Sequence, residues 1–168
     1  VGHSFGGATI RLFSQILANG VEDEVKASGD DVSPFFKGGK GDYIYSMTTL
    51  AAPHNGTTAY LVTPEDDPNP TKGLNGKIEK ALSGAMGKVN AGDSDGRSDK
   101  DFASYDMDID NAAALNATIE TLPDVYYFSY PASSTVKQDN GTYAPVNKKT
   151  EILFRMSSRA MGAYTGTT

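Results

Sequence analysis

The chain has 168 residues, the length of one ordinary domain, and its 38% apolar and 21% charged residues permit a packed core. A formal net charge of −6 without any dense cluster of Lys and Arg argues against nucleic acid as a partner. The absence of Cys excludes disulfides, thiolate metal sites and a Cys nucleophile, and no apolar run approaches the roughly 20 residues that span a membrane.

The chain opens on VGHSFGG, and residues 2–6 of this stretch fit the pattern G-x-S-x-G. In that pattern a Ser lies on a tight turn between a strand and a helix, and the glycines leave room where the two elements pass close together. Ser4 is therefore predicted to be a nucleophile at a helix N-terminus. The backbone N–H of Phe5 is predicted to donate to an oxyanion. A purely structural Gly-Ser turn is the alternative.

A helix and a strand are predicted after this turn. The helix runs from Gly6 to Asn19, because apolar residues recur there at helical spacing and a Gly follows. Residues 21–41 are polar and predict a connection with a short helical turn around Glu22 to Ala27. The stretch from Tyr43 to Ala52 is rich in aromatic and β-branched residues and predicts a buried strand. This order of turn, helix and strand indicates a parallel α/β layer. The apolar residues of the helix are Ala8, Leu12, Phe13, Ile16 and Leu17.

The middle of the chain, residues 63–100, is predicted to be a lid or an insertion. Residues 63–75 are rich in Pro, so regular structure is not expected there. A helix is predicted from Gly76 to Asn90, with its apolar residues on one face. This face either belongs to the core or forms a lid that covers an acyl site and is exposed at a lipid surface. Its residues are Ile78, Ala81, Leu82, Ala85, Met86 and Val89.

Two further helices and a second strand are predicted in the last third of the chain. Asp110 is predicted to cap a helix over Asn111 to Glu120, because a carboxylate can accept from the free amides of the first turn. The stretch from Asp124 to Pro131 predicts the strand, and the stretch from Glu151 to Met161 predicts the last helix.

Three blocks in this order carry a family resemblance: VGHSFGGATIRLFSQILANG at residues 1–20, SPFFKGG at 33–39 and SMTTLAAPHNGTT at 46–58. They resemble the secreted triacylglycerol lipases of staphylococci and thermophilic bacilli, which carry G/A-H-S-x-G-G-Q-T-x-R, S-P-L-F-x-G-G and S-x-T-T-x-A-T-P-H-x-G. A weaker match continues through residues 101–116 and 125–130. The resemblance implies one partial α/β-hydrolase domain over residues 1–168, from the nucleophile turn to about the seventh strand.

Departures from the family pattern make the substrate range the least transferable property. Ala8 stands where the family usually has Gln, and Ala52 stands where it has Thr. Residues 59–100 are shorter than the lid and insertion of the family.

A Ser nucleophile needs a base, and in α/β-hydrolases the acid and the His follow the Ser along the chain. The sequence has only His3 and His54. His3 is adjacent to Ser4 and its side chain should diverge from it, so a structural role is expected. His54 is expected near the site but is interpreted as a supporting residue, not the base. The resemblance implies that the catalytic Asp and His follow Thr168 and that the second oxyanion donor precedes Val1. The chain is therefore expected to be an internal fragment that is inactive by itself.

The resemblance also implies a zinc ligand at Asp101, whose partners, an Asp and two His, would precede Val1. An ordinary solvated Asp is the alternative. The serine chemistry is expected to need no cofactor, and zinc or calcium is expected only as a structural ion of the full-length protein. Four acidic residues, Asp93, Asp95, Asp99 and Asp101, could attract calcium, but the EF-hand pattern is not met.

The sequence thus predicts part of a secreted carboxylic ester hydrolase, a lipase or esterase, that forms an acyl-enzyme on Ser4. Its expected substrates are lipids or other esters, met at a lipid–water interface. Two alternatives remain open: a non-catalytic lipid- or partner-binding protein on the same fold, and another serine hydrolase such as a phospholipase or an acyltransferase.

Overall fold

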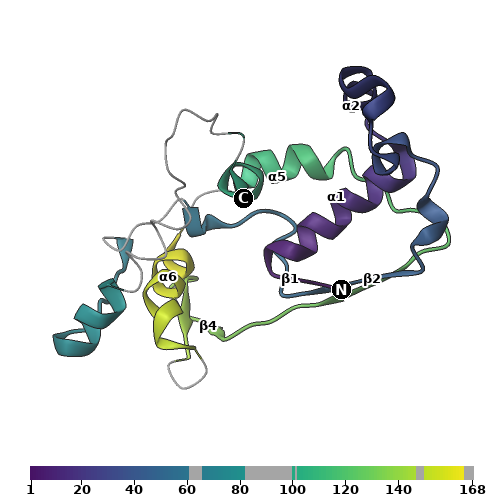
Figure 1. Cartoon of the computed structure of the whole chain (residues 1–168). Coiled ribbons are helices and arrows are strands. Elements are labelled where there is room, and N and C mark those ends of the chain that lie inside the picture. Colours follow the sequence, from purple (N-terminus) through teal and green to yellow (C-terminus); the bar gives the residue numbers. More distant parts are fainter. Residues whose placement is uncertain (61–65, 82–99, 101, 147–149, 165–168) are drawn as a thin grey trace. The chain divides into compact units, whose positions relative to one another are not determined.

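A computed structural model describes residues 1–60, 66–81, 100, 102–146 and 150–164 (Figure 1). The chain divides into two compact units. The first consists of Val1–Asn55 and Ala113–Ala132, and the second of Gly56–Ala112 and Ser133–Thr168. Each unit therefore draws on two separate stretches of the chain.

The first unit is built on a parallel sheet with the strand order β1-β2-β3. The strands are β1 (Gly2–His3), β2 (Ser46–Leu50) and β3 (Tyr126–Tyr130). Gly2 pairs with Thr49, and β2 and β3 pair in register from Ser46 with Tyr126 to Leu50 with Tyr130. The predicted parallel α/β layer is thus observed, although β2 and β3 are shorter than predicted.

Helix α1 (Phe5–Asn19) begins directly after the turn at Ser4 and packs against β1 and β2 (Figure 1). It ends at Gly20, whose φ of 77° and close approach to Phe36 leave no place for a side chain. The predicted helix is therefore confirmed, with its first residue at Phe5. The predicted short helical turn in the following connection is α2 (Glu22–Ser28). Three short 3-10 helices follow it, at Gly29–Asp31, Pro34–Lys37 and Gly41–Tyr43.

The buried face of α1 differs from the apolar face that its spacing predicts. Leu12 and Phe13 are exposed, and only Leu17 of the predicted apolar face is buried, whereas the polar residues Ser14 and Gln15 are buried. Gln15 explains this arrangement, because its amide donates to the carbonyl of Glu120 and accepts from the amide of Glu120. Paired hydrogen bonds of this kind offset the cost of burying the amide.

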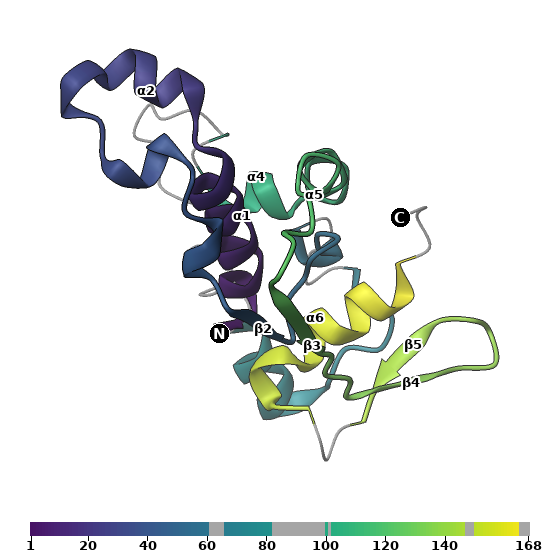
Figure 2. The same cartoon turned by 90° about the vertical axis from the view of Figure 1, so that its right-hand side faces the viewer.

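The second unit contains residues 73–81 in a helix, α4 (Ala103–Met107), the start of α5 (Ile109–Asn116) and α6 (Ile152–Ala163). It also contains an antiparallel hairpin of β4 (Thr135–Lys137) and β5 (Tyr143–Pro145), and a 3-10 turn at Thr58–Tyr60. Figure 2 shows α6 beside the hairpin. The two are in close contact, since a Cβ on Gly162 would overlap the carbonyl of Tyr143.

The sequence misplaced the cap of α5. Asp108 Oδ1, not Asp110, accepts from the amides of Asp110 (3.0 Å) and Asn111 (3.3 Å). The helix therefore starts at Ile109, and it ends at Asn116 instead of Glu120. The last helix is close to its prediction, with Glu151 just before its first residue.

The helix predicted from Gly76 to Asn90 begins earlier, at residue 73, and residues 82–90 lie outside the described part. Leu74, Ile78 and Ala81 are exposed, with Ile78 at 40%. Glu79 is 1% exposed. The described part of this helix thus turns its apolar residues outward and buries a carboxylate, which disagrees with the core interpretation of this face.

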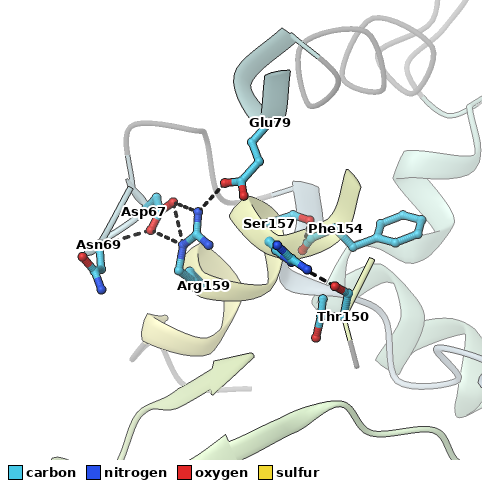
Figure 3. A network of polar contacts seen from close by, with 8 residues as sticks. Asp67, Asn69, Glu79, Thr150, Phe154, Ser157 and Arg159 are labelled. Atoms are coloured by element: carbon cyan, nitrogen blue, oxygen red, sulfur yellow. Dashed lines mark hydrogen bonds and ion pairs between the residues drawn. The ribbon is translucent and has the colours of Figure 1, made fainter. Parts of the chain in front are cut away.

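Arg159 on α6 explains the burial of Glu79 (Figure 3). Its guanidinium donates to both carboxylate oxygens of Asp67 at 2.8–2.9 Å and to Glu79 Oε2 at 2.8 Å. The hydrogen bonds to Asp67 are the largest cause of a raised pKa of Arg159, and the hydrogen bond to Glu79 raises it further, so the guanidinium stays charged. This ion cluster ties residue 67 and the 73–81 helix to α6. None of the helices in the described ranges is both long and apolar enough to cross a membrane.

Candidate nucleophile turn

Ser4 lies between β1 and α1 in a backbone conformation that residues with a Cβ seldom adopt. Its φ is 52° and its ψ is −129°. Such a conformation costs about 1–3 kcal/mol, persists only where the surroundings enforce it, and is found mainly at functional sites. Here the amide of Ser4 donates to Leu50 O at 2.9 Å, and the carbonyl of Ser4 accepts from Gly7 N at 3.0 Å. The Ser4 residue is exposed, and its side chain makes no capping hydrogen bond to α1. The hydroxyl is therefore open to another reactant.

The glycines of the opening stretch are not equivalent. A Cβ on Gly2 would lie 2.8 Å from the Cα of Gly7, and a Cβ on Gly7 would overlap the Cβ of Ala52. A Cβ on Gly6 would meet no atom within 4 Å. The predicted close approach of helix and strand thus requires glycine at positions 2 and 7. The expectation that Gly6 also leaves no room for a side chain is wrong.

Phe5 is the first residue of α1, so its amide N–H has no acceptor within the helix. The 15-residue helix has no acidic residue in its first turn, so no side-chain charge there opposes the positive end of the helix dipole. This geometry suits a donor to a developing oxyanion next to Ser4. The catalytic roles of Ser4 and Phe5 stay predictions.

His3 is exposed and lies in β1, where it pairs with Leu50. No hydrogen bond joins the side chains of His3 and Ser4 among the contacts of the described residues.

His54 is held by three side chains of the first unit, and the four residues together form the His54 cluster: His54, Arg11, Thr49 and Asn116. Its Nε2 lies 3.0 Å from Thr49 Oγ1, and its Nδ1 lies 3.4 Å from a guanidinium nitrogen of Arg11. The same nitrogen of Arg11 donates to Asn116 Oδ1 at 2.9 Å. Asn116 Nδ2 in turn donates to the carbonyl of His54 at 2.6 Å.

The cluster fixes the protonation of the His54 ring. A guanidinium can only donate, so Nδ1 must accept and Nε2 must carry the hydrogen that is given to Thr49. Burial, and then the positive charge of Arg11, lower the pKa of His54. His54 is thus a neutral imidazole with both nitrogens engaged, as a supporting residue would be. It has no free lone pair with which to act as the base for Ser4.

Sequence reasoning did not find Arg11, Thr49 and Asn116. Arg11 and Asn116 are 105 residues apart, and no local pattern connects them. The available signal was weak: Arg11 and Thr49 both fall inside the blocks that resemble the lipases.

The predicted metal ligand Asp101 lies outside the described residues, as do Asp93, Asp95 and Asp99. Within the described part of the chain, no group of three or more His, Asp or Glu side chains is arranged to hold a metal ion. The residues described here do not by themselves fit a zinc or calcium centre.

Comparison with known proteins identifies relatives of this chain. A family model described as "Lipase-like, C-terminal domain" matches residues 1–67. Lipase 2 of Staphylococcus aureus is 31% identical over 191 aligned positions, which cover 96% of this chain and 27% of that protein. The chain is a relative of the staphylococcal lipases. The resemblance of its sequence blocks to that family is thereby confirmed.

Solved structures agree with this relationship to the lipases. EstA from Clostridium botulinum matches 99% of this chain and 45% of its own, with a TM-score of 0.75 and 29% identity. Staphylococcus hyicus lipase matches 97% of this chain and 48% of its own, with a TM-score of 0.67 and 26% identity. This lipase relative thus spans about a quarter of the curated relatives and less than half of the solved chains.

Proposed function

We propose that the protein containing this chain is a carboxylic ester hydrolase, a lipase or esterase, that works through an acyl-enzyme on Ser4. The observation that carries the proposal is the enforced conformation of Ser4, exposed and uncapped at the start of α1, in a relative of the lipases. A bare G-x-S-x-G pattern would not carry it, because the pattern alone also fits a structural turn.

In the proposed reaction, Ser4 Oγ attacks the carbonyl carbon of an ester while a base takes the hydroxyl proton. The carbonyl oxygen of the ester becomes negatively charged and accepts a hydrogen bond from the backbone N–H of Phe5. The ester C–O bond then breaks, the alcohol leaves with the proton, and water hydrolyses the acyl group from Ser4. Because His54 faces Arg11 and Thr49 with its two nitrogens, the base is proposed to be a His outside these 168 residues.

Lipids are the proposed substrates, met at a lipid–water interface, because the relatives are named lipases. The outward apolar residues Leu74 (73% exposed) and Ile78 support a lid within residues 63–100, since such a face can contact lipid. An extracellular location is proposed on the same resemblance. The serine chemistry needs no cofactor, and a zinc or calcium ion, with Asp101 as a zinc ligand, is proposed only as a structural ion of the intact protein.

The test is Ser4→Ala in the intact protein. It should abolish both ester hydrolysis and labelling by a fluorophosphonate, which reacts with activated serines. Ser133→Ala, which removes an exposed hydroxyl of the second unit, should leave both unchanged. Labelling that persists in Ser4→Ala would overturn the assignment.

Two other outcomes would separate the alternatives. A wild-type protein that binds lipid vesicles but is neither labelled nor active would be a non-catalytic lipid-binding protein. Ser4-dependent labelling with turnover of phospholipids or acyl transfer, and not of simple esters, would identify another serine hydrolase.

A further inference from the structure

We propose that His54 is a positioning residue for Ser4: its neutral ring, held between Arg11 and Thr49, fixes the loop of residues 51–55 against α1 and thereby maintains the conformation of the nucleophile turn. The inference rests on the proposed function of Ser4. In this inference the His54 cluster affects the reactivity of Ser4 through the backbone and does not contact the substrate.

The loop of residues 51–55 touches the nucleophile turn directly. It follows Leu50, whose carbonyl accepts from the amide of Ser4. Ala51 has a φ of 47°, and its amide donates to Tyr130 O at 2.9 Å. Ala52 fills the space in which Gly7 has no side chain. A shift of this loop is therefore expected to disturb Leu50, which precedes it, and Ala52 within it, and both lie against the turn at Ser4.

His54 makes several of the contacts that hold this loop. Its amide donates to Ala52 O at 3.0 Å, which closes a tight turn within the loop. Its ring connects the loop to Arg11 on α1 and to Thr49 on β2, and its carbonyl accepts from Asn116. One residue thus links the loop to the helix, to the strand and to the end of α5.

The charge of Arg11 beside His54 favours the neutral form of the ring. Arg11 is the only charged side chain that contacts the ring among the described residues, and Thr49 and Asn116 are neutral. No ion pair joins Arg11 to a carboxylate among the described residues. A second proton on His54 would place two positive charges 3.4 Å apart and remove the acceptor that Arg11 now faces.

The experiment compares His54→Ala, His54→Gln and Gln15→Ala in the intact protein. His54→Ala should slow fluorophosphonate labelling and lower kcat on a short-chain nitrophenyl ester by about 10- to 100-fold, the size of effect that a small misplacement of a reacting group produces. KM should change by less than about 3-fold, because the cluster does not touch substrate. His54→Gln should recover much of the rate, since an amide offers one acceptor and one donor and cannot be charged.

Gln15→Ala is the matched control. Gln15 lies on α1 one turn beyond Arg11, is buried where Arg11 and His54 are half-buried, and bonds to the 116–120 segment, but it does not reach residues 51–55. It should lower stability and leave the labelling rate within about 2-fold of wild type. If His54→Ala does not fold, Thr49→Val serves instead, because it removes the acceptor of the ring N–H and, besides that, only a long hydrogen bond of 3.5 Å to Phe128 O.

A spectroscopic readout separates positioning from a general loss of stability. Side-chain ¹⁵N NMR of His54 should show the neutral form with hydrogen on Nε2 at pH 8 and a protonation midpoint below pH 6.5, and Arg11→Gln should alter that signature. Ser4-dependent labelling that is as fast in His54→Ala as in Gln15→Ala would overturn this inference alone, as would a ring with hydrogen on Nδ1. Labelling that does not depend on Ser4 would instead overturn the proposed function.

Discussion

Ser4 keeps an unusual backbone conformation because neighbouring residues leave it no alternative. The hydrogen bond from the Ser4 N–H to the Leu50 carbonyl and the lack of space at Gly2 and Gly7 all act on the same turn. These constraints depend on single atoms, so adding the same methyl group at two neighbouring positions should have very different effects on stability.

Gly7→Ala and Gly6→Ala test these constraints with the same methyl group. Gly7→Ala should lower the free energy of unfolding by about 1–3 kcal/mol, because the new methyl would overlap Ala52. Gly6→Ala should not destabilise, because its methyl meets no atom and Ala is the better helix former by about 1 kcal/mol. Denaturant titrations of both variants check the difference. Equal destabilisation by the two would refute the packing described for this turn.

His54 should give the protein a pH-dependent stability. Its pKa is lower in the folded state than the usual value of 6.5, so between those two values the unfolded chain binds more protons. The free energy of unfolding should therefore decrease as the pH falls below about 6.5. Denaturant titrations of wild type and His54→Gln between about pH 5 and 7.5 measure this, and the variant should show the flatter profile. If the stability of wild type and of His54→Gln changed equally with pH, this prediction would be contradicted.

At the level of elements, local patterns predicted the helices and strands that are set by short stretches of sequence. The positions of α1, β2, β3 and α6 agree with the predictions to within a few residues, because periodicity, Gly stops and β-branched residues act locally. The buried side of α1 and the cap of α5 were predicted wrongly. Each depends on a partner that local spacing does not reveal: the backbone of Glu120 for Gln15, and Asp108 in place of the equally suitable Asp110.

The candidate site was open to local prediction only in part. The turn at Ser4 is encoded in consecutive residues, so Ser4 and Phe5 could be selected as candidates from the motif, and their catalytic roles stay predictions. The His54 cluster could not be selected, because it assembles residues 11, 49, 54 and 116 from four elements or loops. The burial of Glu79 was equally hidden, since its partner Arg159 lies 80 positions away.

The ion cluster of α6 should contribute far more stability than an ion pair on the surface. Arg159→Met would leave the carboxylates of Asp67 and Glu79 buried without a cation, at 0% and 1% exposure, and should cost about 3–5 kcal/mol. Lys26→Met is the control, because Lys26 and Glu22 form an exposed i,i+4 pair worth about 0.5 kcal/mol or less. Thermal and chemical denaturation measure both. A cost for Arg159→Met as small as that of Lys26→Met would show that the cluster contributes no more than a surface pair.

At the level of the whole molecule, the chain carries the candidate nucleophile turn at Ser4 and spans 27% of the length of its curated relative. Neither of its histidines is placed to activate Ser4: His3 lies in β1 with no hydrogen bond to Ser4 among the described contacts, and His54 is engaged by Arg11 and Thr49. The base that the proposed reaction needs is therefore expected to come from another part of the intact protein.

The 168 residues expressed alone should accordingly show no measurable turnover of a short-chain nitrophenyl ester. The intact protein, assayed in parallel, should be active. A clear rate from the isolated chain that disappears in Ser4→Ala would contradict this prediction and would point to His54 as a base after all.

The exposed β3 strand has a practical consequence for any such preparation. All five of its residues, Tyr126 to Tyr130, are exposed, and among the described strands β3 pairs only with β2. Its outer side offers unpaired amides and carbonyls next to aromatic side chains, which is the combination that recruits strands from other molecules. Solutions of the isolated chain should therefore be prone to self-association as the concentration rises, and light scattering should accompany every measurement made on it.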